Sequence, residues 1–153
     1  MKMIWQVYLS GEIHSDWRSE IDRAIKDMEL PIELMSPNTN HEDSDDCAAV
    51  ILGEPGSDFW RDHMGAKMNG IRNRTLIEAA DIVVVRFGDK YRQWNAAFDA
   101  GYAAALGKNL IVQHPAEFTH ALKEVNGAAM ATCETTEQII QTLRYVTTGA
   151  LER

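Results

Sequence analysis

The run Asp81-Ile82-Val83-Val84-Val85-Arg86 limits the possible folds more than any other segment of this chain. β-Branched residues favour a strand, and a strand that is apolar on both faces must be covered on both sides. Strands of this kind are typical of parallel sheets with helices on either face. The run therefore predicts the central strand of an α/β protein.

Short apolar runs alternate with longer helical patterns on both sides of this strand, as expected for parallel strands joined by crossover helices. The pattern predicts an α/β fold in which helices cover a five-stranded parallel sheet. The predicted strands span 4–9, 31–35, 81–86, 109–113 and 128–132, and the predicted helices span 15–28, 66–80, 96–106 and 136–147.

The remaining segment, residues 36–63, is rich in Ser, Pro, Asn, Asp and Gly and has no clear periodicity. It is predicted to be a long irregular loop, and loops of this length are usually functional. Trp60 either closes over a ligand as part of a lid or anchors the loop to the core. The acidic residues around His41–Asp46 match no metal motif, so we expect no metal site there and predict no cofactor.

Length and charge exclude several classes of function. A chain of 153 residues has the usual size of one domain, so residues 1–153 are predicted to form a single domain. Its 23 acidic and 15 basic residues give a net charge of −8, which disfavours binding to nucleic acids and to anionic membranes. No apolar run is long enough for a signal peptide or a membrane span, and Cys47 and Cys133 are expected to be free thiols. We therefore expect a cytoplasmic protein.

Ligands of open parallel sheets bind beyond the carboxyl ends of the strands, near the point where strand order reverses. This rule selects the loops at 10–14, 36–63 and 87–95. The last of these combines aromatic, amide and cationic side chains just before a helix, whose amino terminus favours anions. Arg86, Lys90 and Arg92 could bind a phosphate or carboxylate, or could be solvated partners of Asp89.

Asp99 lies about one turn into that predicted helix. The helix dipole should help to keep its carboxylate ionised, as a nucleophile or charge stabiliser requires. The alternative is that Asp99 is only a favourable residue for the first turn of a helix. Spacing alone does not decide between these two interpretations.

Several motifs resemble the nucleoside 2-deoxyribosyltransferase superfamily, and more closely its YtoQ family, over essentially the whole chain. The superfamily resemblance rests on Tyr8-Leu9-Ser10-Gly11, on Ala80–Val85, and on Phe98–Ala103 followed by Gly107-Lys108. The narrower resemblance rests on Ser36-Pro37 with His41, on Arg86-Phe87-Gly88, and on Tyr91–Tyr102 with its Arg92-Gln93-Trp94-Asn95 run.

The resemblance implies a three-layer sandwich with a flavodoxin-like sheet and a homodimer or larger homo-oligomer with sites near subunit interfaces. It also implies cleavage of an N-glycosidic bond by a carboxylate that attacks the anomeric carbon, as in retaining glycoside hydrolysis. Asp99 matches the nucleophile position, Gly11 the tight first turn, and Tyr8 a position that lines the nucleobase and sugar pocket. The residues expected to bind a nucleoside-like or nucleotide-like substrate are Tyr8, Gly11, Asn73, Arg86, Asp89, Arg92, Gln93, Trp94 and Asn95.

This sequence departs from the superfamily pattern at three positions. Asp99 replaces the usual Glu and is one methylene shorter, and a displacement of about 1 Å can cost roughly a hundredfold in rate. Asn73 stands where transferases usually carry an Asp that handles the base, and an amide cannot act as a general acid. Gln93 or Asn95 replaces a further acid, for which Asp89 could substitute.

Two classes of function follow from this comparison. The first is an N-glycosidic bond enzyme, either a deoxyribosyltransferase or an N-hydrolase, with Asp99 as nucleophile. The second is a protein that binds or senses a nucleotide-like ligand and has lost the chemistry, as the departures at Asp99, Asn73 and Gln93 would allow. A scaffold without a ligand is a third possibility.

Overall fold

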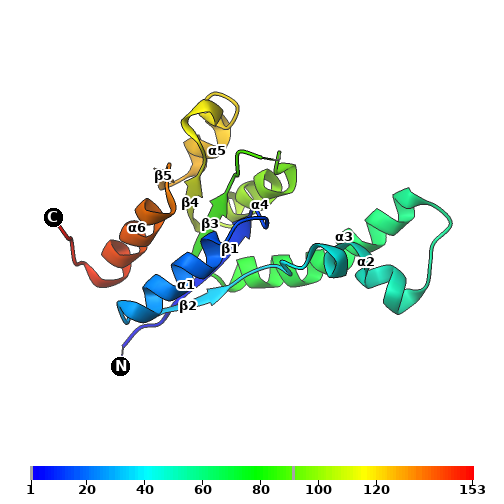
Figure 1. Ribbon diagram of the computed structural model, residues 1–153, viewed down its shortest axis with the longest axis horizontal. Helices are drawn as coiled ribbons and strands as arrows, with labels where there is room; N and C mark the ends of the chain where they lie inside the picture. The colour runs from blue at the N-terminus through cyan, green and yellow to red at the C-terminus, as the bar shows by residue number, and fades with distance from the viewer. Residues whose placement is uncertain (1, 91) are drawn as a thin grey trace.

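The computed structural model describes residues 2–90 and 92–153, and Tyr91 of the motif lies outside the described residues. Five parallel strands form one sheet in the order β2-β1-β3-β4-β5, which confirms the predicted α/β fold (Figure 1). The order reverses between β1 and β3, as in flavodoxin-like sheets. The strands are β1 (Trp5–Gly11), β2 (Ile32–Met35), β3 (Ile82–Arg86), β4 (Asn109–Gln113) and β5 (Ala131–Cys133).

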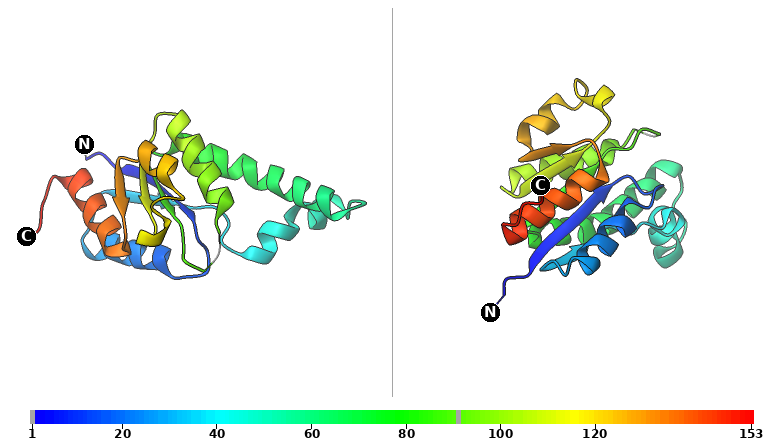
Figure 2. Two further views of the ribbon diagram at one scale, coloured as in Figure 1. Left: turned by 90° about the horizontal axis from the view of Figure 1, so that it is seen from above. Right: turned by 60° about the vertical axis from the view of Figure 1, so that its left-hand side comes forward.

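Strand β3 lies at the centre of the sheet, and its residues from Ile82 to Val85 are buried. Because side chains alternate between the faces of a strand, these four residues contribute to two separate cores. Ile82 and Val84 pack with residues of α1 (Trp17–Asp27) and α6 (Thr136–Thr148), whereas Val83 and Val85 pack with residues of α3 (Asp58–Ala79) and α4 (Trp94–Ala105). Helices therefore cover both faces of the sheet, and the three-layer sandwich is confirmed (Figure 2).

Helix α1 shows why the sandwich could be predicted. Trp17, Ile21 and Ile25 recur every four residues, and all three are buried against the sheet. Helix α4 begins at Trp94, two residues before the predicted start at Ala96, and its Gln93 N-cap makes no side-chain cap hydrogen bond.

Residues 36–63 differ from the prediction of a long irregular loop. They contain the helix α2 (His41–Leu52) and the first residues of α3, which starts at Asp58. Asn40 caps α2 by accepting from the Asp43 amide at 3.0 Å, and Ser57 caps α3 by accepting from the Trp60 amide. The two helices pack against each other and form an arm that projects beyond the sheet (Figure 1). The sequence of this segment lacks the apolar stripe of a sheet-covering helix because most of the arm has no sheet to cover.

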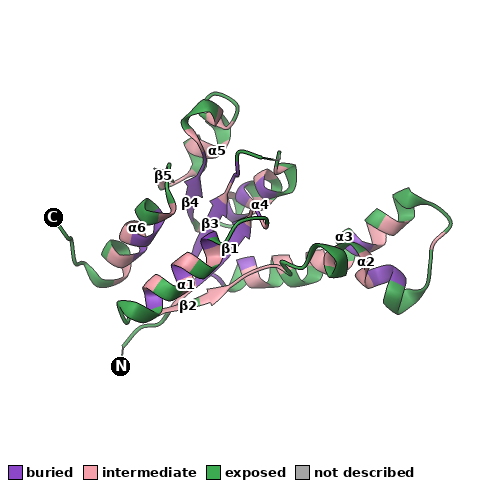
Figure 3. Ribbon diagram, viewed as in Figure 1, coloured by how far each residue is buried: buried purple, intermediate pink, exposed green. Residues whose placement is uncertain are grey.

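Arg61 forms ion pairs that link the two helices of the arm. Its guanidinium pairs with Asp46 at 2.6 Å and with Glu54 at 2.5 Å, and so ties α3 to α2 and to the turn between them. Trp60 is 52 % exposed and packs edge to face on Phe59 and His63, so it does not anchor this segment to the core of the chain. The end of α2 and the start of α3 are largely exposed (Figure 3).

The chain between β4 and β5 also contains structure that the sequence did not predict. A 3-10 turn, η1 (Ala116–Phe118), precedes a short helix, α5 (Lys123–Ala128), and β5 begins at Ala131 instead of the predicted 128. Both helical segments are too short to show a clear apolar period. Among the described residues, no helix is long and apolar enough to cross a membrane.

Candidate functional site

The carboxyl ends of β1 and β3 lie side by side at the point where strand order reverses. Gly11 pairs with Arg86 across the two strands, and the Glu12 amide donates to the Arg86 carbonyl at 3.0 Å. A Cβ on Gly11 would lie 2.1 Å from the Arg86 carbonyl oxygen, and the Gly11 φ of 106° is one that side chains disfavour. Gly11 thus allows the end of β1 to run close to β3.

Asp99 is held at this point by a hydrogen bond from β1. The Ser10 hydroxyl donates to Asp99 Oδ2 at 2.6 Å. Ser10 is fully buried and Asp99 is partly buried, so the contact lies between the sheet and α4. The helix comes close because its residues Ala96, Ala100 and Ala103, which face the sheet, carry only methyl groups.

Burial raises the pKa of the Asp99 carboxyl, and the hydrogen bond from Ser10 opposes this rise. The helix dipole was expected to favour the ionised form, but α4 begins at Trp94, which places Asp99 in the second turn. The influence of the dipole fades within the first turn. Ser10 is thus the group that directly stabilises the Asp99 carboxylate.

Tyr8 lies two residues before Ser10 and points to the same face of the sheet. Its side chain is fully buried, and its hydroxyl has no hydrogen-bond partner among the described residues. Burial raises the pKa of this phenol, the Asp99 carboxylate raises it further, and the cations Arg18 and Arg72 act in the opposite direction. The phenol therefore stays neutral near Asp99 and keeps an unused hydrogen-bonding group.

Asn73 lies on α3, the helix that packs against this face of the sheet beside β1. Its Oδ1 is buried and, like the Tyr8 hydroxyl, has no partner within the described chain. Buried polar atoms are normally hydrogen-bonded, and exceptions require an explanation such as a ligand. A ligand that donates to the amide oxygen would satisfy it.

Arg86 is placed differently from the other predicted residues. It follows Val85 on β3 and so points to the α1 and α6 face, away from the face that holds Ser10. Arg86 Nε donates to Glu12 Oε2 at 3.3 Å. Burial raises the pKa of Glu12, but hydrogen bonds from Ser15 and the His14 amide, together with Arg86, hold it below its usual value.

The loop between β3 and α4 is mostly exposed. The Gln93 side chain accepts a hydrogen bond from the Gly88 amide at 2.8 Å and so shapes the loop itself. Trp94 is 74 % exposed, and Arg92 and Asn95 are exposed as well. The predicted residues thus fall into four groups. Tyr8, Gly11 and Asp99 lie at the switch point, and Asn73 lies on the covering helix. Arg86 and Asp89 line a cavity at the carboxyl edge of the sheet, and the remaining loop residues are mostly exposed.

Two residues that the sequence did not identify also belong to this region. Ser10 was part of the selected loop at 10–14 and of the Tyr8–Gly11 motif but was given no role, although its alternation with Tyr8 would have placed both on one face. Arg18 of α1 donates to the Leu9, Gly11 and Glu12 carbonyls, with its shortest bond, 2.7 Å, to Glu12. Burial lowers the pKa of Arg18 to about 10, so this cation remains charged at neutral pH.

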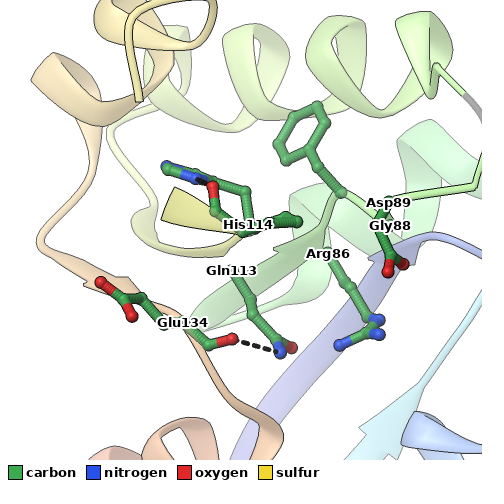
Figure 4. Close-up of a pocket in the computed structure, with 8 residues that line it drawn as sticks. Arg86, Gly88, Asp89, Gln113, His114 and Glu134 are labelled. Carbon is green, nitrogen blue, oxygen red and sulfur yellow. Dashed lines mark hydrogen bonds between the residues drawn. The ribbon is translucent and has the colours of Figure 1, made fainter. Parts of the chain in front are cut away.

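Two cavities open at the carboxyl edge of the sheet. One of about 290 Å³ lies beside the ends of β1 and β2 and includes Arg18 and Met35. The other, of about 210 Å³, lies beyond β3, β4 and β5 and includes Arg86, Gln113 and Glu134 (Figure 4). Across the described residues, no group of three or more His, Cys, Asp or Glu side chains is arranged to hold a metal ion.

Comparison with known proteins agrees with the resemblance seen in the sequence. The model of the family described as nucleoside 2-deoxyribosyltransferase YtoQ matches residues 8–147. The chain belongs to this family. YtoQ of Bacillus subtilis (strain 168), an uncharacterised protein, is 43 % identical over 140 residues, which cover 92 % of this chain and 95 % of that protein.

Solved structures share the fold of this YtoQ family member at lower sequence identity. A 2-deoxyribosyltransferase from Bacillus psychrosaccharolyticus aligns with a TM-score of 0.61 and 21 % identity, over 90 % of this chain and 95 % of that one. A conserved protein from Enterococcus faecalis V583 aligns with a TM-score of 0.63 and 15 % identity, over 94 % and 99 % of the two chains. The deoxyribosyltransferase-like architecture therefore extends over most of the chain.

Proposed function

We propose that this YtoQ family member cleaves the N-glycosidic bond of a nucleoside or nucleoside monophosphate, with Asp99 as the nucleophile. The observation that carries the proposal is the 2.6 Å hydrogen bond from Ser10 to a partly buried Asp99 at the switch point of the sheet. A carboxylate at this point, with one oxygen fixed and one left to react, is suited to attack on a sugar carbon. Membership of a family described as nucleoside 2-deoxyribosyltransferase supports the same chemistry.

The reaction has two displacements. An oxygen of the Asp99 carboxylate bonds to the anomeric carbon as the bond from that carbon to the base nitrogen breaks. The electron pair of this bond leaves with the base, which takes up a proton, and a glycosyl ester forms on Asp99. Water or a second base then attacks the same carbon, gives up a proton to the solvent and releases Asp99 as a carboxylate, which gives hydrolysis or transfer respectively.

The buried groups around Asp99 are suited to substrate recognition. The neutral Tyr8 hydroxyl can donate to or accept from a sugar hydroxyl, and Asn73 Oδ1 can accept from a donor on the base. Both atoms lie on the side of the sheet that carries Asp99. Such contacts fix orientation, which is a large part of the rate gain in reactions of this kind.

A chromatographic assay of base release tests the proposal. Purified protein is incubated with a panel of nucleosides and nucleoside monophosphates, beside Asp99→Asn and the control Asp62→Asn, which changes an exposed acid on α3. We expect release by the wild type and the control and none by Asp99→Asn. A family enzyme that is active in the same assay makes a negative result meaningful, and turnover by Asp99→Asn would remove Asp99 from the mechanism.

Mass spectrometry gives a second test of the nucleophile. Acid quenching during turnover of a slow substrate should trap a pentosyl ester, seen as added mass on the peptide that contains Asp99. The adduct should be absent from Asp99→Asn. An adduct on another peptide would reassign the nucleophile.

The loop cations favour a phosphorylated substrate, with Arg92 and Lys90 as the phosphate contacts. Arg86 contributes less to this preference because Glu12 already pairs with it on the other face. Comparison of deoxycytidine with its monophosphate tests the preference. Equal rates for the two would remove the argument for a phosphate contact.

Asn73 favours a second candidate function, that of a nucleotide-like ligand binder without catalysis. An amide in this position cannot deliver a proton to the leaving base. Its unpartnered Oδ1 can still accept a hydrogen bond from a bound base. Saturable binding of a nucleoside monophosphate that is recovered unchanged after long incubation would support this function over the enzyme.

We also infer that the protein is a homodimer or larger homo-oligomer that uses the arm formed by α2 and α3. Large apolar side chains are exposed where α2 ends and α3 begins. Phe59 and Trp60 pack on each other there, with ring centroids 5.1 Å apart, which places apolar surface at one end of the molecule. Exposed apolar patches of this kind mark sites of association, and a second copy of the arm offers a matching surface. The apolar side chains concerned are Val50, Ile51, Leu52, Phe59 and Trp60.

A further inference from the structure

A second polar cavity lies at the carboxyl edge of the sheet, where the side chains of Arg86 and Gln113 point to the face opposite to Asp99. It has a volume of about 210 Å³ and lies beyond the carboxyl ends of β3, β4 and β5. Arg86 and Gln113 are paired neighbours on β3 and β4, and both point into this region (Figure 4). The residues before them, Val85 and Val112, belong to the core on the Asp99 side. Alternation along the strands therefore directs Arg86 and Gln113 away from the face that holds Asp99.

Gln113 provides the observation that points to a ligand. Its side chain is only 3 % exposed, and its Nε2 donates to the Glu134 carbonyl at 3.3 Å. Its Oε1 is buried and has no hydrogen-bond partner in the described part of the chain. A buried amide oxygen in this state lacks the donor that such atoms normally have. A ligand N–H or O–H in the cavity would supply that donor.

Arg86 supplies the opposite hydrogen-bonding group beside Gln113. Its Nε is used by Glu12 Oε2 at 3.3 Å, whereas no hydrogen bond within the described residues uses its two terminal nitrogens. A guanidinium donates through all three nitrogens, so these two can still serve a ligand acceptor. The ligand therefore meets a donor from β3 and an acceptor from β4.

Charge decides which ligands fit this arrangement. The Glu12 carboxylate already balances the positive charge of Arg86, and Asp89 adds a further carboxylate to the lining, whereas Glu134 directs its backbone carbonyl to Gln113 (Figure 4). A phosphate or carboxylate would face this negative charge and the lone pairs of Gln113 Oε1. A neutral molecule avoids both sources of repulsion.

Shape restricts the ligand further. The cavity is smaller than the roughly 300 to 1,000 Å³ of sites for drug-sized molecules, so it suits a single small ring. Pro115 adds apolar surface to the lining, against which a flat ring can pack.

We propose that this cavity binds a small, neutral, flat heterocycle whose edge carries a hydrogen-bond acceptor next to an N–H donor, as a free nucleobase does. The acceptor receives hydrogen bonds from the terminal nitrogens of Arg86, and the N–H donates to Gln113 Oε1. The site is separate from Asp99 and is occupied without turnover. Its ligand chemistry follows from the cavity and does not depend on the proposed glycosidic reaction.

Calorimetric titration of the full chain tests this site with cytosine as the probe. Cytosine offers acceptors beside an N–H donor, and benzoate serves as a flat anion of similar size. We expect saturable binding of cytosine with a dissociation constant below about 1 mM, and no binding of benzoate. Gln113→Met, which keeps length and removes the acceptor, should weaken cytosine binding at least about tenfold, since buried polar recognition is lost.

Asp62→Asn, which changes an exposed acid on α3, is the matched control, and it should bind cytosine as the wild type does. Amide NMR spectra of the wild type provide a measurement that does not depend on whether Gln113→Met folds. Cytosine should shift the signals of Gly88 and Gln113. The proposal would be overturned by shifts centred on Ser10, by unchanged affinity in Gln113→Met, or by tighter binding of benzoate. It would also be overturned if cytosine did not bind, because water would then be the partner of Gln113.

Discussion

Removal of the Ser10 hydroxyl tests whether this group holds Asp99 in its reactive position. Ser10→Ala deletes the donor to Asp99 Oδ2, which is 2.6 Å away, and leaves the backbone pairing of β1 with β3 in place. The substitution removes a single oxygen atom from a fully buried position. Its effect should therefore report on one hydrogen bond to one carboxylate.

The size of the effect follows from the charge on the acceptor. A hydrogen bond to a charged group contributes about 1.5 to 3 kcal/mol. If this stabilisation is lost in the transition state, kcat/KM falls by about 10- to 150-fold. Because Ser10 contacts Asp99 and not the substrate, we expect most of the loss in kcat, with KM changed by no more than about twofold.

The pH profile gives a readout that a merely structural role would not produce. Burial raises the pKa of Asp99, and the Ser10 hydrogen bond opposes this, so its loss should raise the pKa further. Asp99 must be ionised to attack, and activity therefore falls as the pH drops through its pKa. In Ser10→Ala the acidic limb of kcat/KM, measured as base release by chromatography, should move to higher pH.

A double-mutant comparison shows whether Ser10 acts through Asp99. Addition of Ser10→Ala to Asp99→Asn should leave the residual rate unchanged, since the carboxylate on which the serine acts is already absent. A further loss by the same factor would refute the reasoning. An unchanged rate and pH profile in a folded Ser10→Ala protein would refute it as well, with thermal unfolding as the check on folding.

Three further predictions follow from the same geometry. Because burial raises the pKa of Asp99, the folded state binds this proton more tightly than the unfolded chain, so the ionised acid lowers stability at neutral pH. Asp99→Asn should therefore raise the thermal midpoint of unfolding at neutral pH. The increase should shrink as the pH falls through the raised pKa towards the ordinary Asp value. A midpoint of the variant below that of the wild type at neutral pH would contradict this. Gly11→Ala should lower the free energy of unfolding in urea by more than the roughly 1 to 3 kcal/mol of backbone strain, since its Cβ would also lie 2.1 Å from a carbonyl oxygen. The control is Gly70→Ala, whose added Cβ meets nothing within 4 Å. This control should be neutral or stabilising by up to about 1 kcal/mol. Trp60→Asp should shift the sedimentation coefficient of the protein towards that of a monomer, and a wild type that is already monomeric would exclude the arm as an interface.

The sheet could be predicted because burial on both faces leaves few alternatives to a β-branched strand such as Ile82–Val85. The arm could not, because α2 and α3 pack mainly on each other and expose residues such as Ile51 and Phe59 that a sheet-covering helix would bury. Without a core-facing stripe, the Ser, Asn, Asp and Gly residues of 36–63 indicated a loop, although Asn40 and Ser57 are in fact helix caps.

The candidate site was only partly predictable for a related reason. Motif matching identified Asp99, Tyr8 and Gly11, but sequence spacing cannot tell on which side of the sheet a residue near the end of a strand will act. Arg86 was grouped with the cations of the next loop, whereas the alternation after Val85 directs it to Glu12 on the other face. Gln113 carried no signal because its neighbour Arg86 comes from a different strand.

The short acid at position 99 and the alanines of α4 are consistent with each other. An Asp reaches less far than a Glu by one methylene, so a helix that carries Asp must lie closer to the strand that it serves. Ala96, Ala100 and Ala103 are all buried against the sheet, and their methyl groups permit that close approach. The 2.6 Å bond from Ser10 then fixes the carboxylate at the shorter distance. The missing methylene thus does not by itself argue against catalysis, because the helix backbone can make up for it.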